Sequence, residues 1–310
     1  MSVFISYSRW NKPFGDHLRL DLQRAGLTVW LDMFDLDAGR GWNDAIRTAI
    51  EAATHVVVLM SPESAKSEVV LQEVAYAQSL GKPLVPLLVG GEPESLPHGW
   101  PKLHMLDFRK RHYREMLPEV LRNLDPKLPV PLGYDSFLDR LGVTTAHAAR
   151  ELGGRTIHSH GRAFAVIPTG PTGYTTTCLI GPADQEFRLP REVAGLLHFS
   201  GPDSRRADQD VLDHLNGASP TGPEWLIAVT GPVNPHEHRY ELTDPHVWRD
   251  GVEASVRAVE WFLKGRDVRL FLNCPVPLGF AVGVRGKDFF QSYTLYHFSG
   301  GSYKMTYERK

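Results

Sequence analysis

Residues 55–75 read HVVVLMSPESAKSEVVLQEVA and join a short apolar run to a longer stretch of mixed character. The first part, His55–Ser61, is rich in β-branched residues and lacks polar alternation, which is typical of a strand buried on both faces of a parallel sheet. Ser61 and Pro62 then supply an N-cap and a proline at the first helical position, and Gly81 stands where a C-terminal glycine belongs. The stretch therefore predicts a buried strand followed by one helix.

The same alternation of strand-like and helical stretches continues on both sides. Further strands are expected at Val3–Ser8, Leu27–Asp32, Pro83–Val89 and Leu103–Phe108, and helices at Phe14–Arg24, Asp44–Ala53 and Tyr113–Leu124. A repeated strand–helix pattern predicts a parallel α/β sheet covered by helices on both faces. Because crossovers between parallel strands are right-handed, the carboxyl ends of the strands share one edge, where ligands usually bind.

A change of composition divides the chain. The segment Asp125–Gly133, DPKLPVPLG, contains three prolines, which disfavour helix and suit an extended linker. We therefore expect a first domain at 1–124, a linker at 125–133 and a second domain at 134–310, which also has an α/β pattern. Its expected elements are helices at Phe137–Leu152 and Val247–Lys264 and strands at Arg162–Pro168, Tyr174–Gly181, Gly195–Gly201, Glu224–Gly231 and Arg269–Pro275.

Composition and charge exclude several classes of protein. The 310 residues include 34 basic and 36 acidic side chains, and each half is close to neutral. Bulk electrostatic binding to DNA, RNA or an anionic membrane is therefore not expected, whereas a small anionic ligand needs only a few local donors. The two cysteines cannot form a disulfide framework, and neither a signal-peptide pattern nor an 18-residue apolar segment is present. We expect a soluble, cytoplasmic protein.

Three blocks of the first domain together resemble the TIR domain, the Toll/interleukin-1 receptor fold. They are FISYS at the first strand, LTVWLD with the following DLDAGRGW, and the serine-containing stretch Ser61–Ala75. The resemblance covers about Ser2–Phe108 and implies a flavodoxin-like parallel sheet. TIR domains of bacteria and plants are often enzymes that cleave NAD between nicotinamide and ribose, whereas others are only adaptors. The catalytic glutamate of the family lies in its third helix, and the matching position here is Glu73.

The residues around Glu73 are compatible with this role. Its helical neighbours Val69, Tyr76 and Ala77 form a largely apolar face, where a carboxylate is costly unless it is paired or faces a cleft. Glycosidic cleavage passes through an oxocarbenium-like state that a carboxylate stabilises, and nicotinamide leaves as a neutral group without a general acid. Taken alone, Glu73 is more typical of a partly exposed helical glutamate, and the resemblance favours catalysis. Glu68 is explained as a favourable charge near the helix start.

Five other positions are candidates for binding NAD⁺ as substrate: Tyr7, Arg9, Asp37, Trp42 and Val69. Arg9 follows the first strand and suits a phosphate, or it is a surface arginine. Trp42 ends a loop that is flexible in the family and either stacks on a base or packs inward at a helix start. Asp37 lies in the same loop and is also compatible with a turn. Val69 replaces a tryptophan that the family often has, which changes one wall of the pocket.

The second domain resembles the SAVED domain, a pair of fused Rossmann-like, CARF-related halves that sense cyclic oligonucleotides in bacterial anti-phage defence of the CBASS type. The resemblance rests on NCPVPLGFAVG at 273–283, on QSYTLYHF and SYKMTYE, and on HFSG and AVTG at two strand ends. Backbone N–H groups at strand–helix turns suit such a ligand. The implied cyclic-nucleotide-binding residues are Ser200, Gly201, Thr230, Gly231, Asn273, Pro275 and Arg285. Arg285 is a candidate for binding a phosphate, but a surface arginine is the preferred interpretation.

Together the two resemblances imply an anti-phage effector. A cyclic oligoadenylate, with cyclic tri-adenylate as the best candidate, would bind the second domain and switch on NAD⁺ hydrolysis by driving self-association into head-to-tail oligomers or filaments. No cofactor is expected, because NAD⁺ is the substrate and the cyclic nucleotide is the activator. Two alternatives stay open: a non-enzymatic TIR signalling adaptor, and a TIR NADase activated by a cyclic dinucleotide, as in receptors of the STING type.

Two other patterns carry no function. The pairs His158/His160 and His236/His238 are spaced two residues apart and match no zinc motif, so no metal site is expected. Cys274 has no flanking signature of a nucleophile, and a buried, inert cysteine is the preferred interpretation.

Overall fold

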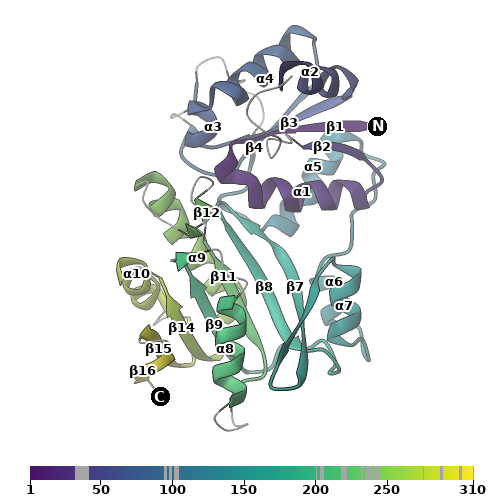
Figure 1. Ribbon diagram of the computed structural model, residues 1–310. Helices are drawn as coiled ribbons and strands as arrows, with labels where there is room; N and C mark the ends of the chain where they lie inside the picture. The colour runs from purple at the N-terminus through teal and green to yellow at the C-terminus, as the bar shows by residue number, and fades with distance from the viewer. Residues whose placement is uncertain are drawn as a thin grey trace. The chain divides into compact units, whose positions relative to one another are not determined.

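The structure, a computed structural model, describes residues 1–31, 42–93, 96–97, 100, 105–199, 201–202, 206–217, 222–231, 233–234, 239–240, 245–274, 276–286, 289–299 and 302–309 (Figure 1). These residues form two compact units. Unit 1 comprises Met1–Pro131 together with the short segment Pro171–Tyr174, and unit 2 comprises Leu132–Gly170 and Thr175–Lys310. Unit 1 is therefore built from two separate stretches of chain, and each unit has its own sheet.

Unit 1 contains a five-stranded sheet in which every strand pairs parallel to its neighbours. The strands are β1 (Ser2–Ser6), β2 (Thr28–Leu31), β3 (His55–Met60), β4 (Leu84–Leu88) and β5 (Leu106–Asp107). Their order is β2-β1-β3-β4-β5, the flavodoxin-like order. The parallel sheet expected from the sequence is confirmed, and this order places a topological switch point between β1 and β3.

Helices cover both faces of this sheet (Figure 1). They are α1 (Lys12–Arg24), α2 (Trp42–Ala52), α3 (Pro62–Lys66), α4 (Glu68–Ser79) and α5 (Tyr113–Leu124). On one face, Phe14 of α1 and Leu117 of α5 pack with Ile5 of β1. On the other face, Val74 of α4 packs with Val58 of β3. Burial of apolar side chains on both faces explains why the strands are almost entirely apolar.

The single helix expected after β3 is two helices. Ser67 lies between α3 and α4 in an extended conformation, and its Oγ accepts a hydrogen bond from the backbone N–H of Val70 at 3.4 Å. Ser61 caps α3 in the same way, accepting from the N–H of Ser64 at 3.1 Å. The prediction of one continuous helix is wrong because a second serine cap starts a new helix.

Unit 2 contains an eight-stranded mixed sheet. Its strands are β6 (Arg155–Ser159), β7 (Arg162–Thr172), β8 (Thr175–Pro182), β9 (Glu192–His198), β11 (Leu226–Thr230), β14 (Asp267–Asn273), β15 (Ser292–Ser299) and β16 (Ser302–Arg309). The order is β16-β15-β14-β9-β11-β8-β7-β6. β15, β14, β9 and β11 are parallel, and the outer strands pair antiparallel. Only the parallel part contains the strand–helix–strand units that the sequence predicts.

The helices of unit 2 define a second switch point. They are α6 (Asp135–Leu138), α7 (Thr145–Glu151), α8 (Arg206–Gly217), α9 (Pro245–Leu263) and α10 (Val276–Gly286). Val211 of α8 packs with Leu196 on one face of the sheet, whereas Val259 of α9 and Leu278 of α10 pack with Leu197 on the other. β9 is followed by α8 on one face of the sheet, and the neighbouring β14 is followed by α10 on the other. The chain therefore leaves these two strands towards opposite faces. A crevice is therefore expected at the carboxyl ends of β9 and β14.

Several expectations for the second half need correction. The helix predicted at Phe137–Leu152 is α6 and α7, because Gly142 between them has a φ of +74° and Thr144 caps α7. No strand is expected from the sequence at β6, β15 or β16. A small additional sheet, β10-β13-β12, is formed by Gly201–Pro202, Arg239–Tyr240 and Val233–Asn234, that is, by the segments that follow β9 and β11.

Asp208, in the first turn of α8, should give unit 2 a pH-dependent stability. Burial raises the pKa of this carboxyl to about 6, although Arg155 donates a hydrogen bond to it at 3.1 Å. An unfolded aspartate has a pKa of 3.8, so the protonated form stabilises the folded state. This contribution is complete below about pH 4 and is lost as the pH rises through about 6.

We therefore expect Asp208→Asn to flatten the decrease in unfolding free energy between about pH 5 and pH 7.5, an effect of order 1–3 kcal/mol. Urea titrations at the two pH values measure it. The matched control is Asp210→Asn on the same helix, which should keep the wild-type pH dependence. Equal flattening in both variants would assign the effect to the charge of α8 rather than to the buried Asp208.

Candidate functional site

The switch point between β1 and β3 carries a set of polar side chains. Five of them are buried and come from the carboxyl ends of β1 and β3 and the segments that follow, and we name them the β1–β3 cluster: Ser6, Ser8, Asn11, Ser61 and Ser64. Asn11 ends the short 3-10 helix η1 (Arg9–Asn11), which follows β1. Polar groups at this edge of an open α/β sheet are typical of a ligand site.

Asn11 is the centre of this cluster. Its Oδ1 accepts hydrogen bonds from the hydroxyls of Ser8 at 2.8 Å, Ser61 at 2.9 Å and Ser64 at 3.1 Å. The Ser64 hydroxyl also accepts from the backbone N–H of Ser8 at 3.3 Å. Since Ser8 follows β1 while Ser61 and Ser64 belong to the start of α3, these bonds hold the two chain segments together. Buried polar networks of this kind rigidify their surroundings when their members are hydrogen-bonded.

Glu73 reaches the cluster from the second turn of α4. The residue is only 3% exposed, and its Oε2 accepts a hydrogen bond from the hydroxyl of Ser6 at 2.5 Å. Val70 and Val74, on either side of it in the helix, are buried against the sheet, so the position of the carboxylate is fixed by packing. The alternative of a partly exposed surface glutamate is therefore wrong. Burial of a carboxylate is costly for stability, and buried carboxylates are common in functional sites.

This arrangement supplies one positioned carboxylate beside several hydroxyls. A carboxylate held in a buried site stabilises positive charge that develops nearby, because it is already oriented and little water screens it. Within the described part of the chain, no group of three or more His, Cys, Asp or Glu side chains is placed to hold a metal ion. In this position, Glu73 can stabilise a cationic transition state electrostatically.

Ser6→Ala tests how far the hydroxyl of Ser6 supports this carboxylate. Without the Ser6 donor, Oε2 of Glu73 loses its hydrogen bond in a buried place, and a bond to a charged group contributes about 1.5–3 kcal/mol. For NAD⁺ cleavage, the activity that the resemblance to TIR domains implies, we expect kcat/KM to fall about 10-fold or more. Ser79→Ala, at the exposed end of α4, is the control and should keep the wild-type value. Unchanged kinetics in Ser6→Ala would separate Ser6 from the reaction.

The structure brings some of the proposed substrate-binding residues to this edge and not others. Arg9 is exposed in η1, directly after the segment that carries Ser8, and Val69 is partly buried one turn before Glu73 in α4. Tyr7 is different, because its side chain packs in the core on the opposite face of the sheet. Because side chains alternate along the chain, Ser6 and Tyr7 point to opposite faces, and the proposed contact of Tyr7 with NAD⁺ stays a prediction.

Two further substrate-binding candidates cannot be placed. Trp42 is the first residue of α2, and its side chain lies outside the described part of the structure, as does the whole of Asp37. Their proposed contacts with NAD⁺ stay predictions. The loop between Met33 and Gly41, which the resemblance assigns to contacts between TIR domains, is also outside the described residues.

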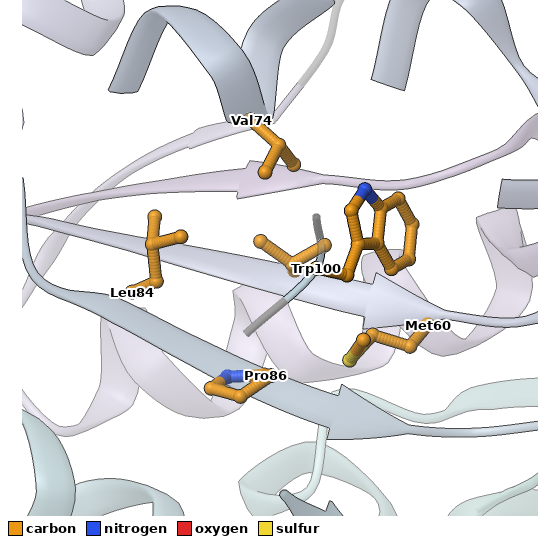
Figure 2. A pocket seen from close by; sticks show the side chains of 6 residues that line it. Met60, Val74, Leu84, Pro86 and Trp100 are labelled. Carbon is orange, nitrogen blue, oxygen red and sulfur yellow. The ribbon is translucent and has the colours of Figure 1, made fainter. Parts of the chain in front are cut away.

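A small apolar hollow lies between α4 and strands β3 and β4 (Figure 2). Six side chains line it: Val58, Met60, Val74, Leu84, Pro86 and Trp100. Its enclosed space is too small for a water molecule, and none of its lining side chains is charged. Figure 2 shows the Trp100 indole close to Val74 and Met60. The hollow is a gap in the packing under α4, and it is not a nucleotide site.

Unit 2 has a second row of polar side chains at its switch point. Asn273, His198, Thr230 and Thr176 are partners in register on the neighbouring strands β14, β9, β11 and β8. Partners in register point to the same face, so these four side chains, here named the strand-edge row, lie side by side. The Nδ2 of Asn273 is 2.9 Å from Nδ1 of His198, and the hydroxyls of Thr230 and Thr176 are 2.6 Å apart. A ligand at these strand ends would meet hydrogen-bond donors and acceptors.

Sequence reasoning found two members of this row, Thr230 and Asn273, and missed His198. A polar residue at the end of the apolar run GLLHF was the available signal, but only the strand pairing shows that His198 lies beside Asn273. Gly231 has a packing role in the structure, and its proposed role in binding stays a prediction. Its N–H donates to the carbonyl of His198 at 2.9 Å, and a Cβ there would lie 2.4 Å from the ring of Phe199, so this glycine allows close packing.

Two of the remaining residues proposed for cyclic-nucleotide binding lie in other elements, and all of these roles stay predictions. Arg285 is in the last turn of α10, about 13 Å along the helix from its start beside β14, so it lies towards the opposite edge of the sheet. Gly201 belongs to β10 of the small sheet. Ser200 and Pro275 lie outside the described residues.

The two cysteines do not supply a nucleophile. Burial raises the pKa of the Cys178 thiol to about 12, and it does the same for Cys274. At neutral pH both are thiols, and the thiolate is the reactive form. None of the described helices combines the length and the apolar character needed to cross a bilayer.

Comparisons with known proteins agree with the fold of unit 1. The family model described as "TIR domain" matches residues 3–121, so the chain carries a TIR domain at its N-terminus. Among solved structures, the chain is similar to the TIR domain of the Toll-related receptor TRR-2 from Hydra magnipapillata, with 24% identity over 39% of this chain and 93% of that one and a TM-score of 0.33.

Two other solved structures have likenesses of the same kind. The TIR domains of the activated Roq1 resistosome, which directly recognizes the pathogen effector XopQ, are 25% identical over 28% of this chain and 55% of that one, with a TM-score of 0.25. A prokaryotic SEFIR domain is 18% identical over 42% of this chain and 97% of that one, with a TM-score of 0.31. Each of these likenesses covers less than half of this chain.

Proposed function

We propose that this protein is a regulated NAD⁺ hydrolase whose TIR domain cleaves the bond between nicotinamide and ribose. The observation that carries the proposal is the buried carboxylate of Glu73, held by Ser6 at the switch point of a TIR-domain sheet. Some members of this family hydrolyse NAD⁺, and the position of their catalytic glutamate matches Glu73.

The residues have distinct roles in the proposed reaction. The bond between the ribose anomeric carbon and the nicotinamide nitrogen breaks, and its electron pair neutralises the pyridinium, so no general acid is needed. Glu73 stabilises the positive charge left on the ribose. Water then adds to the anomeric carbon and loses a proton to solvent, which gives ADP-ribose. Arg9, exposed beside the site, is the candidate for binding the pyrophosphate.

The strand-edge row is the proposed sensor site. Amide, imidazole and hydroxyl groups in one line match the hydrogen-bonding edges of nucleobases, and they lie at the switch point where α/β sheets bind ligands. A cyclic oligoadenylate is the proposed activator, with cyclic tri-adenylate as the first candidate, as the resemblance of this half to SAVED domains implies. This role places the protein in anti-phage defence of the CBASS type.

A panel experiment tests the proposal. Purified full-length protein is mixed with NAD⁺ and, one at a time, with cyclic di-, tri- and tetra-adenylate, and released nicotinamide is measured. We expect release only with one of these ligands. Release with cyclic dinucleotides alone would favour a receptor of the STING type. An adaptor that only recruits other TIR proteins would release no nicotinamide under any condition.

Self-association is the proposed route of activation. A head-to-tail contact between second domains builds an open filament when its rotation does not close a ring. Ligand-induced contacts of that kind raise the effective concentration of TIR domains for each other. Light scattering recorded in the same panel should show particle size and specific activity rising together with protein concentration. Full activity from a ligand-bound monomer would exclude this route while leaving the NAD⁺ chemistry in place.

A further inference from the structure

The second segment of unit 1, Pro171–Tyr174, carries a fully buried tyrosine. Tyr174 is 0% exposed, and its hydroxyl donates a hydrogen bond to Oε2 of Glu63 in α3. The other oxygen of this carboxylate, Oε1, is buried and has no hydrogen-bond partner among the described residues. A half-buried carboxylate with a single buried phenol as its partner is costly for stability, so it requires another explanation.

Gly90, just after β4, is shaped to receive this ring. A Cβ at Gly90 would lie 2.6 Å from Oη of Tyr174 and 2.9 Å from two of its ring carbons. The backbone at Gly90 is not in the left-handed region, so an unusual φ does not explain the glycine. The absence of a side chain instead allows the Tyr174 ring to approach the backbone closely. Tyr174 is therefore seated between the end of β4 and the start of α3, at the carboxyl edge of the sheet.

A short path joins Tyr174 to the Glu73 site. Its partner Glu63 precedes Ser64, which is bonded to Asn11 and to the N–H of Ser8. Ser8 follows Ser6 on the same stretch of chain, and the Ser6 hydroxyl donates to Glu73. Any displacement of the start of α3 therefore acts on the β1–β3 cluster through bonds that are already formed.

An equally short path joins Tyr174 to the strand-edge row. Tyr174 is the last residue of its segment, and Thr175 continues the chain as the first residue of β8. Thr176, only two residues from Tyr174 and so within about 7 Å along the chain, bonds to Thr230 in the row. Thr175 between them is fully buried, so the link has little freedom to absorb a movement.

We infer that Tyr174 is a positioning residue of the Glu73 site, through which occupancy of the strand-edge row changes the start of α3. The inference rests on the proposed function, since it describes how the same catalytic site is regulated. It differs from self-association because the path runs within one chain, through Glu63, and needs no second copy. Coupling between two sites is a free energy that must be measured, so the test measures enzyme activation and ligand binding separately.

Three variants break the path at different points. Tyr174→Phe removes the donor, Glu63→Gln replaces the charged acceptor by a neutral one, and Gly90→Ala displaces the ring by steric contact. The probe is cyclic tri-adenylate. We expect each variant to lose at least 10-fold of the ratio of ligand-activated to basal kcat, while the Kd of cyclic tri-adenylate from calorimetry stays within twofold of wild type. Tyr113→Phe, which alters a buried tyrosine on the other face of the sheet, is the control and should keep the full ratio.

Hydrogen exchange separates this inference from the proposed function. In wild type, cyclic tri-adenylate should change the exchange of the Ser64 and Ala65 amides in α3, and in Tyr174→Phe that response should be absent. If wild type never releases nicotinamide, the proposed function fails and the exchange response alone decides the inference. An activation ratio or an exchange response that is unchanged in all three path variants would overturn it. Glu63→Gln, at a half-buried position, keeps the test possible if Tyr174→Phe does not fold.

Discussion

Glu73→Gln is expected to lower the rate of NAD⁺ cleavage at least 100-fold. The amide has nearly the same shape as the carboxylate but no charge, so the oxocarbenium-like state loses an electrostatic stabilisation of about 3 kcal/mol or more. Release of nicotinamide under activating conditions measures the change. The free energy of unfolding and the affinity for cyclic tri-adenylate should stay close to the wild-type values.

Glu68→Gln is the matched control for this variant. This substitution makes the same chemical change on the same helix, but Glu68 is the exposed first residue of α4. We expect a decrease below twofold there, because only a favourable interaction with the helix N-terminus is lost. Near-normal turnover in Glu73→Gln would place the chemistry at another residue, and the buried carboxylate would then be structural.

The fold of unit 1 was predictable because its strands carry a strong local signal. The run of β-branched residues in β3 does not have the spacing of a helix face. It is followed by Ser61 and Pro62, which start a helix. The break at Ser67 was less predictable, since a serine in a helical pattern either points to solvent or caps a new helix. In unit 2, β16 was missed although Tyr303, Met305 and Tyr307 alternate with polar residues, because the strand is exposed along most of its length and has no continuous apolar run.

The candidate sites were predictable only in part, for a different reason. Glu73 could be assigned by resemblance, but its partner Ser6 is 67 residues away, and only strand order brings them together. In the same way, only the pairing of β9 with β14 brings His198 beside Asn273. Tyr7 is the opposite case: it is next to Ser6 in sequence, yet its side chain points to the other face of the sheet. Sequence distance carries little information about which side chains share a sheet edge.

Asn273→Ala should remove the proposed ligand control of NAD⁺ cleavage. The change deletes the amide beside Nδ1 of His198 and takes away donors and acceptors from one end of the strand-edge row. Buried hydrogen-bonding groups left without partners cost about 1–3 kcal/mol, so we expect the Kd of cyclic tri-adenylate to rise about 30-fold. Calorimetry with the full-length protein measures it. At a ligand concentration that just saturates wild type, NAD⁺ cleavage should be nearly absent.

The pattern of recovery distinguishes this effect from damage to the TIR domain. Because Asn273→Ala weakens binding and leaves Glu73 untouched, excess cyclic tri-adenylate should restore the wild-type kcat, which no amount of ligand does for Glu73→Gln. Asn216→Ala is the control, since this asparagine lies at the far end of α8, bonded to Arg162 at the opposite edge of the sheet. If Asn273→Ala bound cyclic tri-adenylate with wild-type affinity, the crevice between β9 and β14 would not be the sensor site, and the ligand would have to bind at another place in unit 2.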